Sequence, residues 1–210
     1  HMARLLDDLL DVARITRGHI TLRTEPVDLR DAARSAIEAL EPFLSEHDTV
    51  LTVEIAGEPL HVIGDMARLQ QIQANLLSNA SKYSPRGSQV RFELCRLGDD
   101  AMIRVTDHGR GIDRDMLPHI FDLFVQGHQT LARSEGGLGV GLTLLKSLVE
   151  LHHGRVEAHS DGPGHGSTFT VWLPLAATAT LETEGADPHA NPAVQTVGGW
   201  TGWGRGRRAG

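Results

Sequence analysis

Residues 65–83 constrain the fold more than any other stretch, because they predict one long amphipathic helix. Apolar side chains recur there at intervals of three and four residues, at Leu69, Ile72, Leu76 and Ala80. Asp65 can cap the N-terminus with its carboxylate, and Pro85 disfavours helical backbone at Ser84. We therefore expect this apolar stripe to pack against a core, with the helix ending near residue 83.

A second face of the same helix carries amides, because Asn75, Asn79 and Lys82 stand at positions i, i+4 and i+7. A solvated face more usually carries Glu, Lys or Arg, since the Asn side chain competes with the backbone. An Asn carbonyl is a neutral oxygen ligand suited to Mg²⁺, and a Lys ammonium suits phosphate. The pattern fits a wall that binds a ligand, and it also fits a polar surface with incidental Asn.

The amino-acid composition excludes or disfavours several classes of protein. The formal net charge of −7 disfavours a partner nucleic acid, since a nucleic-acid-binding domain is normally basic. The single cysteine, Cys95, excludes an internal disulfide and a multi-cysteine metal site, and its apolar neighbours predict a small buried side chain. No apolar run reaches membrane-spanning length and no signal peptide is visible, so we expect a cytoplasmic domain. Whether the parent protein is anchored in a membrane stays open.

The periodicity along the chain predicts an α+β fold, a two-layer α/β sandwich with helices on one face of a mixed sheet. Helices are expected at 3–17, 29–46, 65–83, 115–123 and 139–152. Strands are expected at 49–55, 60–63, 89–95, 101–106, 154–160 and 167–173, with a hairpin turn at 98–100. Pro42 should kink the helix at 29–46 or end its regular part.

The domain boundaries follow from the same patterns. His1 and Met2 look like residues left by cloning, so we expect the natural protein to begin upstream. A short helical segment at 3–18 precedes the main domain at 19–175. From Ala176 onward the periodic patterns stop and Thr, Ala, Pro, Gly and Asp dominate, so residues 176–210 are expected to be a disordered linker or tail.

The sequence contains two glycine-rich loops of interest, one directly after a predicted strand and one at the beginning of a predicted helix. Gly109 and Gly111 come directly after a predicted strand, and they would let the backbone approach a ligand closely. Asp107 stands at the end of that strand, where its carboxylate can accept a hydrogen bond from an exocyclic amine such as that of adenine. A tight turn with a capping Asp would explain the same residues.

The second loop, residues 136–142, opens a helix whose exposed N–H groups and dipole make an anion site. A third glycine segment, residues 162–166, joins two strands and is expected to be a structural turn. Neither of the first two loops has the spacing of a dinucleotide-binding fingerprint, and the Walker A pattern is absent. Two glycine loops and an amide-bearing helix in this order are more specific together than any one of them.

On these residues, the stretch 65–174 resembles the catalytic and ATP-binding domain of bacterial sensor histidine kinases, which has the Bergerat-type fold of the gyrase, heat-shock chaperone and mismatch-repair ATPases. The resemblance rests on an N box at 75–85, a G1 box at 107–112, an F box at 120–124 and a G2 box at 137–142. Residues 3–17 resemble the end of the dimerisation and phosphotransfer hairpin, and 124–126 resemble hybrid kinases in which a receiver domain follows.

The resemblance implies a role for each motif residue. Asn79 would ligate Mg²⁺, and Asn75 would line the γ-phosphate region and help to position the acceptor imidazole. Lys82 would contact phosphate, Tyr83 would pack near adenine, and Asp107 would bind the adenine amine. Other residues would contact ATP beside the base, in the phosphate loop or at the hinge of that loop. They are Gly109, Gly111, Ile112, Phe124, Gly137, Leu138, Gly139, Val140, Gly141, Leu142 and Thr168. Residues 125–136 would form a lid that excludes water during phosphoryl transfer.

The implied reaction is transfer of the ATP γ-phosphate to a His on a dimerisation helix. No phosphoacceptor box occurs in the chain, and His119, His152 and His153 stand in structural contexts, so the chain alone is not expected to autophosphorylate. The implied partners are the dimerisation and phosphoacceptor helices of the parent kinase, a response-regulator receiver domain, and a second subunit in a homodimer.

Two alternatives remain. His108 stands where the family usually has Asn, and a degenerate, non-catalytic nucleotide-binding signalling module would tolerate that change. An ATP hydrolase of the same superfamily usually places a Glu one turn before the metal-binding Asn. Asn75 occupies that position here, which disfavours hydrolysis.

Overall fold

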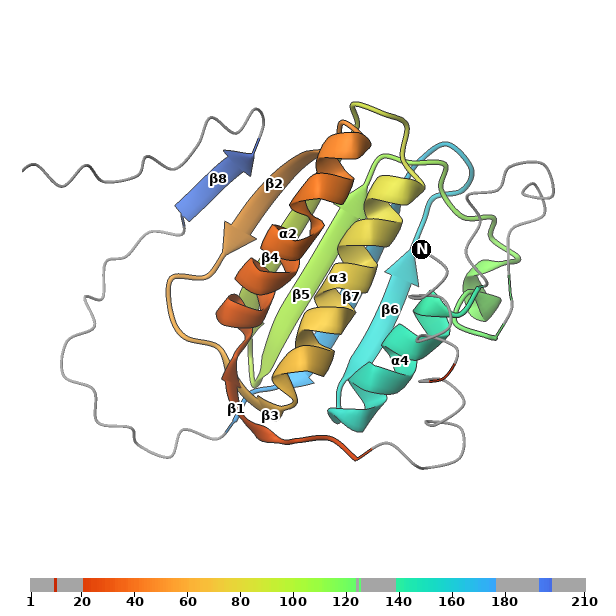
Figure 1. Ribbon diagram of the computed structural model, residues 1–210. Helices are drawn as coiled ribbons and strands as arrows, with labels where there is room; N and C mark the ends of the chain where they lie inside the picture. The colour runs from red at the N-terminus through yellow and green to blue at the C-terminus, as the bar shows by residue number, and fades with distance from the viewer. Residues whose placement is uncertain (1–9, 11–20, 124, 126–138, 177–192, 198–210) are drawn as a thin grey trace, which may run out of the picture.

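The computed structural model describes residues 10, 21–123, 125, 139–176 and 193–197. They form the expected two-layer α+β fold, with helices on one face of a mixed sheet (Figure 1). The helices of this described part are α2 (Leu29–Glu46), α3 (Met66–Lys82) and α4 (Gly141–Leu151). Its strands are β1 (Glu25–Asp28), β2 (Val50–Ile55), β3 (His61–Gly64), β4 (Gln89–Leu97), β5 (Asp100–Asp107), β6 (Arg155–His159), β7 (Ser167–Pro174) and β8 (Ala193–Val197).

The main sheet has the strand order β6-β7-β5-β4-β2-β8. Only β2 and β4 pair in parallel among these strands, and the other neighbours are antiparallel. The turn between β4 and β5 lies where the sequence predicts it, with Gly98 at a φ of +65°. β5 therefore lies in the interior of the sheet, and its C-terminal end carries the Asp107 motif.

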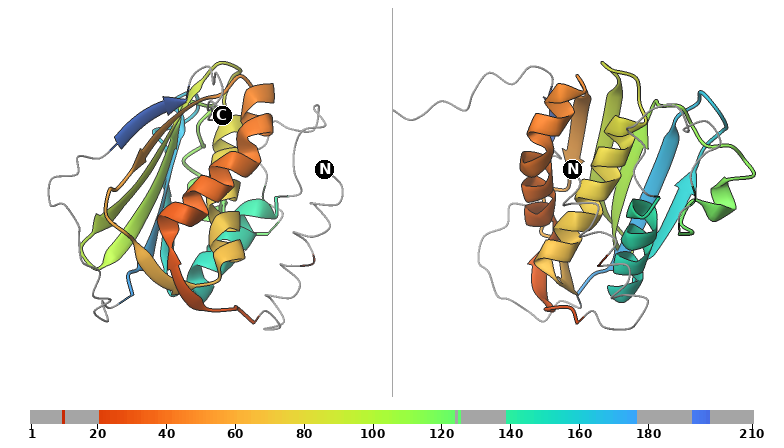
Figure 2. Two further views of the ribbon diagram at one scale, coloured as in Figure 1. Left: turned by 60° about the vertical axis from the view of Figure 1, so that its left-hand side comes forward. Right: turned by 45° about the vertical axis from the view of Figure 1, so that its right-hand side comes forward.

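The helices cover one face of the sheet (Figure 2), and the buried core residues come from both layers. The apolar stripe predicted on the long helix is buried as expected, at Leu69, Ile72, Leu76 and Ala80. The side chain of Asp65 caps α3, because it accepts hydrogen bonds from the N–H groups of Ala67 (3.1 Å) and Arg68 (3.3 Å). α3 thus ends within one residue of its predicted bounds, and its amide-bearing face is set beside α4.

Several local expectations are wrong or incomplete. Pro42 lies inside α2, which continues to Glu46 and does not end at the proline. Pro42 and Glu38, whose carbonyl loses its helical partner, are both exposed residues, so water can solvate the freed carbonyl. The helix expected at 115–123 is reduced to a 3-10 turn at Leu117–His119. Cys95 is only half-buried, and burial raises the pKa of its thiol.

Two strands were not expected from the sequence. β1 pairs antiparallel with β3, and β8 pairs antiparallel with β2 inside the stretch expected to be a disordered tail. Apart from Leu10 and Val125, the helix expected at 3–17 and the lid expected at 125–136 lie outside the described residues. Within the described part, no helix is long and apolar enough to cross a bilayer.

His152 joins the end of α4 to the beginning of α3. Nε2 of its buried imidazole accepts a hydrogen bond from the Asp65 N–H at 3.1 Å, and Nδ1 donates to the Leu148 carbonyl at 2.7 Å. This pair of hydrogen bonds requires a neutral ring with its proton on Nδ1. Gly64 lies against the ring, since a Cβ on Gly64 would stand 2.6 Å from His152 Cδ2. The two helices run antiparallel from this joint (Figure 1).

The variant His152→Gln is expected to weaken the dependence of stability on pH. Burial lowers the pKa of His152 below its ordinary value of 6.5, so the unfolded chain takes up the proton first as the pH falls. The free energy of unfolding should then decrease below pH 6.5, by at most about 1.4 kcal/mol per pH unit from this group. Urea unfolding of both proteins at several pH values measures the difference, and parallel curves would contradict the role assigned to His152.

Candidate ATP-binding site

Asp107 ends β5 and faces the helix layer, where the residue is only 5% exposed. Its Oδ1 accepts two hydrogen bonds, from the N–H groups of Gly109 at 2.8 Å and Ser167 at 3.2 Å. Oδ2 makes no hydrogen bond to any of the described residues. The carboxylate is thus fixed through one oxygen, and the other is available to a ligand amine.

The surroundings of Asp107 make its Oδ2 atom a strong hydrogen-bond acceptor. Burial raises the pKa of the carboxyl, and the hydrogen bonds from Gly109 and Ser167 oppose this rise. A hydrogen bond from a ligand gains strength where water is excluded, because the local dielectric constant is low. The position therefore suits recognition of a neutral donor such as an exocyclic amine.

The loop after β5 needs glycine because other backbone lies directly against it. A Cβ on Gly109 would stand 2.3 Å from the carbonyl oxygen of Tyr83, which accepts the Arg110 N–H at 3.0 Å. Gly111 has a φ of +70°, and a Cβ there would stand 2.1 Å from the carbonyl oxygen of Gly162. The loop is therefore packed between the end of α3 and the turn before β7.

The third glycine segment, residues 162–166, holds this loop from the other side. The N–H groups of Gly164 and Gly166 donate to the carbonyls of Arg110 (2.6 Å) and Gly109 (3.1 Å). Ser160 Oγ accepts the Ile112 N–H at 3.0 Å. The segment is a structural turn, as expected, and the structure it supports is the glycine loop beside Asp107.

The end of α3 brings two further predicted residues to the same loop. The guanidinium of Arg110 lies 4.3 Å from the ring centroid of Tyr83, and Lys82 Nζ lies 5.2 Å from that centroid. Because Arg110 belongs to the glycine loop and Lys82 to α3, Tyr83 joins the two motifs through its ring and its carbonyl. The predicted N-box and G1 residues therefore converge on one side of the sheet.

The amides and the second glycine loop lie farther along the helix layer. Asn75 and Asn79 are half-buried on α3, and a buried Nδ2 of Asn75 has no hydrogen-bond partner. At the N-terminus of α4, Gly139 has a φ of +72°, Val140 is buried and no side chain caps the helix. Gly141 has open space where a Cβ would be, and Leu142 packs partly on the core. Phe124, Gly137 and Leu138 lie outside the described residues.

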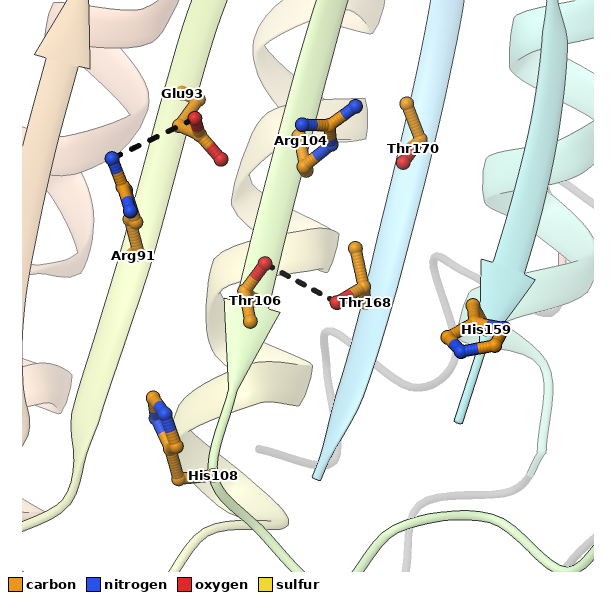
Figure 3. Close-up of a pocket in the computed structure, with 8 residues that line it drawn as sticks. All are labelled: Arg91, Glu93, Arg104, Thr106, His108, His159, Thr168 and Thr170. Carbon is orange, nitrogen blue, oxygen red and sulfur yellow. Dashed lines mark hydrogen bonds and ion pairs between the residues drawn. The ribbon is translucent and has the colours of Figure 1, made fainter. Parts of the chain in front are cut away.

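Thr168 is not brought together with the other predicted residues. Its hydroxyl lies 3.3 Å from that of Thr106, and both side chains line a polar hollow on the opposite face of the sheet (Figure 3). His108 lines the same hollow, and its Nδ1 lies 3.2 Å from the Gln89 carbonyl. Its replacement of the usual Asn therefore leaves the two hydrogen bonds to Asp107 intact. That hollow also holds the Arg91–Glu93 ion pair (Figure 3).

Ser167 is the residue that sequence reasoning missed. It pairs with Asp107 in the β5–β7 ladder, is buried, and donates its N–H to the carboxylate. Side chains alternate across a strand, so the neighbour of Thr168 necessarily points to the helix layer. The alternation of apolar Phe169, Val171 and Leu173 was the signal that could have placed Ser167 on the Asp107 side.

Together these residues can hold an adenine nucleotide. The carboxylate and close-packed glycines suit a planar base with an amine, and the uncapped N-terminus of α4 suits phosphate. Groups of three or more acidic, His or Cys side chains placed to bind a metal do not occur within the described ranges. Any metal here would rely on amide oxygen and on the phosphates themselves, which is how Mg²⁺ usually binds with nucleotides.

Comparison with known proteins identifies the family to which this fold belongs. Residues 64–177 match the family model described as histidine kinase-, DNA gyrase B- and HSP90-like ATPase. The chain is 36% identical over 176 residues to the circadian input-output histidine kinase CikA of Synechococcus elongatus, covering 83% of this chain and 23% of CikA. It is 34% identical to the autoinducer 2 sensor kinase/phosphatase LuxQ of Vibrio harveyi, covering 83% of this chain and 21% of LuxQ. The chain thus spans about a fifth of the curated relatives it matches.

A solved structure has the same fold with bound nucleotide. The structure of full-length ShkA in complex with AMPPNP superposes with a TM-score of 0.72 at 26% identity, covering 86% of this chain and 37% of ShkA. The family model covers more than half of the chain. The chain therefore belongs to the histidine kinase-, gyrase B- and HSP90-like ATPase family, and it contains the ATP-binding catalytic domain of a two-component sensor histidine kinase.

Proposed function

We propose that this domain binds ATP with Mg²⁺ and transfers the γ-phosphate to a His on the dimerisation helices of its parent kinase. The observation that carries the proposal is the carboxylate of Asp107, held through Oδ1 by Gly109 and Ser167 with Oδ2 available to the adenine amine. The unpartnered amide of Asn75 on the adjacent α3 supports a ligand at the phosphate end.

Each residue has a proposed part in that reaction. Asp107 orients the base, and Gly109 and Gly111 let the backbone lie close to it. Lys82 and the N–H groups that follow Gly139 bind the phosphates, and Asn79 offers an amide oxygen to Mg²⁺. The metal, when bound, neutralises charge on the phosphates during a transfer that depends mostly on positioning. Asn75 lies one helical turn from Asn79, where it can orient the acceptor imidazole.

The proposed partners are the dimerisation and phosphoacceptor helices, a second subunit in a homodimer, and a response-regulator receiver domain. One relative is named hybrid signal transduction histidine kinase D, of Dictyostelium discoideum, and is 32% identical over 203 residues. It supports a receiver partner of the hybrid type. No phosphoacceptor box occurs in the chain, so labelling with ATP should require an added acceptor hairpin.

Calorimetry with ATP, followed by phosphotransfer to a separate acceptor hairpin, tests the proposal. Phosphate appearing on the hairpin would exclude a degenerate signalling module. Binding of MgATP without any transfer to a competent hairpin would favour that module instead. Absence of nucleotide binding would reject the site assignment as a whole.

The variant Asn79→Ala is expected to lower the affinity for MgATP at least about tenfold. The reason is that it loses the bond between the Asn79 carbonyl oxygen and Mg²⁺, which contributes ~1.5 kcal/mol or more. The affinity for ATP in EDTA should change little, since the amide acts through the metal. Titration calorimetry with and without Mg²⁺ measures both values. Gln70→Ala, on the same helix, is the matched control. An equal loss in EDTA would contradict metal ligation by Asn79.

A further inference from the structure

Arg110 and Arg155 each lie over an aromatic ring, and the surroundings of the two arginines differ. The guanidinium of Arg155 lies 4.4 Å from the ring centroid of Trp172 and forms an ion pair with Asp100 at 2.8 Å. The guanidinium of Arg110 lies 4.3 Å from the ring centroid of Tyr83 and forms no ion pair with any carboxylate of the described residues. Within the described part, the Tyr83 ring is therefore the partner of the Arg110 charge.

The main chain fixes Arg110 beside this ring. The Arg110 N–H donates to the carbonyl of Tyr83 at 3.0 Å, and the Arg110 carbonyl accepts the N–H of Gly164 at 2.6 Å. Both hydrogen bonds involve only backbone atoms, so they do not depend on the side chain at position 110. The guanidinium thus reaches the ring from a backbone that is held on both sides, and its contact restricts the rotation of the ring.

Tyr83 stands next to the carboxylate that is proposed to bind the adenine amine. A Cβ on Gly109 would lie 2.3 Å from the Tyr83 carbonyl oxygen and 2.8 Å from Oδ1 of Asp107. The backbone of one glycine therefore separates the Tyr83 main chain from that carboxylate. Tyr83 is half-buried, so part of its side chain is open to a ligand. An aromatic ring held at this place suits contact with a planar base.

We propose that Arg110 is a positioning residue for the nucleotide base, because its guanidinium stacks on Tyr83 and holds the ring in the orientation that receives adenine. This inference rests on the proposed ATP-binding function. It gives a role to the side chain between Gly109 and Gly111, a loop that otherwise acts through its backbone. A ring that is ordered before the ligand arrives lowers the entropy lost on binding. Arg110 acts through Tyr83 and makes no contact with the phosphates.

The contact between Arg110 and Tyr83 can be observed directly, because Tyr83 is the single tyrosine of the chain. Protein made with fluorotyrosine therefore gives one fluorine NMR signal, which reports on this ring. In the nucleotide-free protein, Arg110→Gln is expected to shift that signal. Arg155→Gln removes the contact with Trp172 instead, so it is the matched control and should leave the signal in place. A signal that is identical in the wild type and Arg110→Gln would contradict the proposal.

Titrations with adenosine and with AMPPNP, followed through the same signal, test the role in binding. Arg110→Gln should weaken both ligands by the same factor, about fivefold, because the ring contacts the base that they share. Arg110→Lys keeps the charge over the ring and should recover most of that loss. A loss confined to AMPPNP would mean that Arg110 binds phosphate, and tighter binding would mean that it obstructs the ring. Either result would overturn the proposal.

Calorimetry of the wild type separates this inference from the proposed function. If the wild type binds AMPPNP and the Tyr83 signal stays in place at saturation, the proposed function stands and the role of Arg110 is wrong. If the wild type binds neither adenosine nor AMPPNP, the proposed function fails and this inference fails with it. Binding that moves the Tyr83 signal in the wild type, and is weaker in Arg110→Gln for both ligands, is the result that we expect.

Discussion

Asp107→Asn is expected to lower the affinity for ATP about 100-fold, which corresponds to ~2.7 kcal/mol of binding free energy. The asparagine Oδ1 can keep both hydrogen bonds from Gly109 and Ser167, because these converge on one oxygen of the aspartate. The NH₂ group then stands where Oδ2 was and faces the adenine amine, donor against donor. Titration calorimetry of the variant with ATP measures the loss.

Two controls show that this loss comes from base recognition. The preference for ATP over GTP should fall sharply in Asp107→Asn, since the new amide can donate to the guanine carbonyl. The ligand-free variant should be at least as stable as the wild type at pH 7. Burial raises the pKa of Asp107 above its ordinary value of 3.8, so the native state holds its proton longer and stability falls as the pH rises through that window. A destabilised variant with unchanged base preference would contradict the assignment.

Gly166→Ala is expected to lower the free energy of unfolding by about 4 kcal/mol, a size seen when strain and a backbone clash coincide. Gly166 has a φ of +71°, and a Cβ there would stand 2.1 Å from the carbonyl oxygen of Asp107. The nearest atoms that the new Cβ would meet all belong to the backbone of Asp107 and His108, so no side-chain rotation can relieve the clash. Urea unfolding followed by circular dichroism measures the change, and ADP affinity should fall with it.

Gly98→Ala is the matched control for this prediction. Gly98 has a φ of +65° in the turn between β4 and β5, and no atom lies within 4 Å of the Cβ position. The control isolates the cost of a left-handed backbone, which is roughly 1–2 kcal/mol. Similar losses of unfolding free energy in both variants would show that the packing of the turn before β7 against Asp107 contributes little to stability.

The sequence predicts most of the fold because local signals and packing agree in the central elements. Asp65 caps α3 and the stripe from Leu69 to Ala80 is buried, since a cap and a 3.6-residue period are both local properties. β1 and β8 escape prediction because edge strands are specified by a partner distant in the chain, β3 and β2 respectively. The end of the regular helix that Pro42 allowed does not occur, because α2 continues to Glu46.

In the candidate site, too, local sequence signals can be predicted and contacts between distant segments cannot. Asp107, Gly109 and Gly111 could be found because an acidic strand end followed by spaced glycines is visible in the sequence. The alternation of Phe169, Val171 and Leu173 places Ser167 on the helix side of its strand, but that Ser167 stands opposite Asp107 depends on the β5–β7 register, which the sequence does not report.

β7 lies between β5 and β6 in the sheet, and its Ser167 is the later in sequence of the two residues whose N–H groups hold the Asp107 carboxylate. Proteins are synthesised from the N-terminus, so Asp107 leaves the ribosome 60 residues before Ser167. A nascent chain that ends before Ser167 would already contain the complete α3 helix and its amides. It would still lack the main-chain donor of Ser167, so the Asp107 carboxylate is held by both of its hydrogen bonds only after β7 has been synthesised.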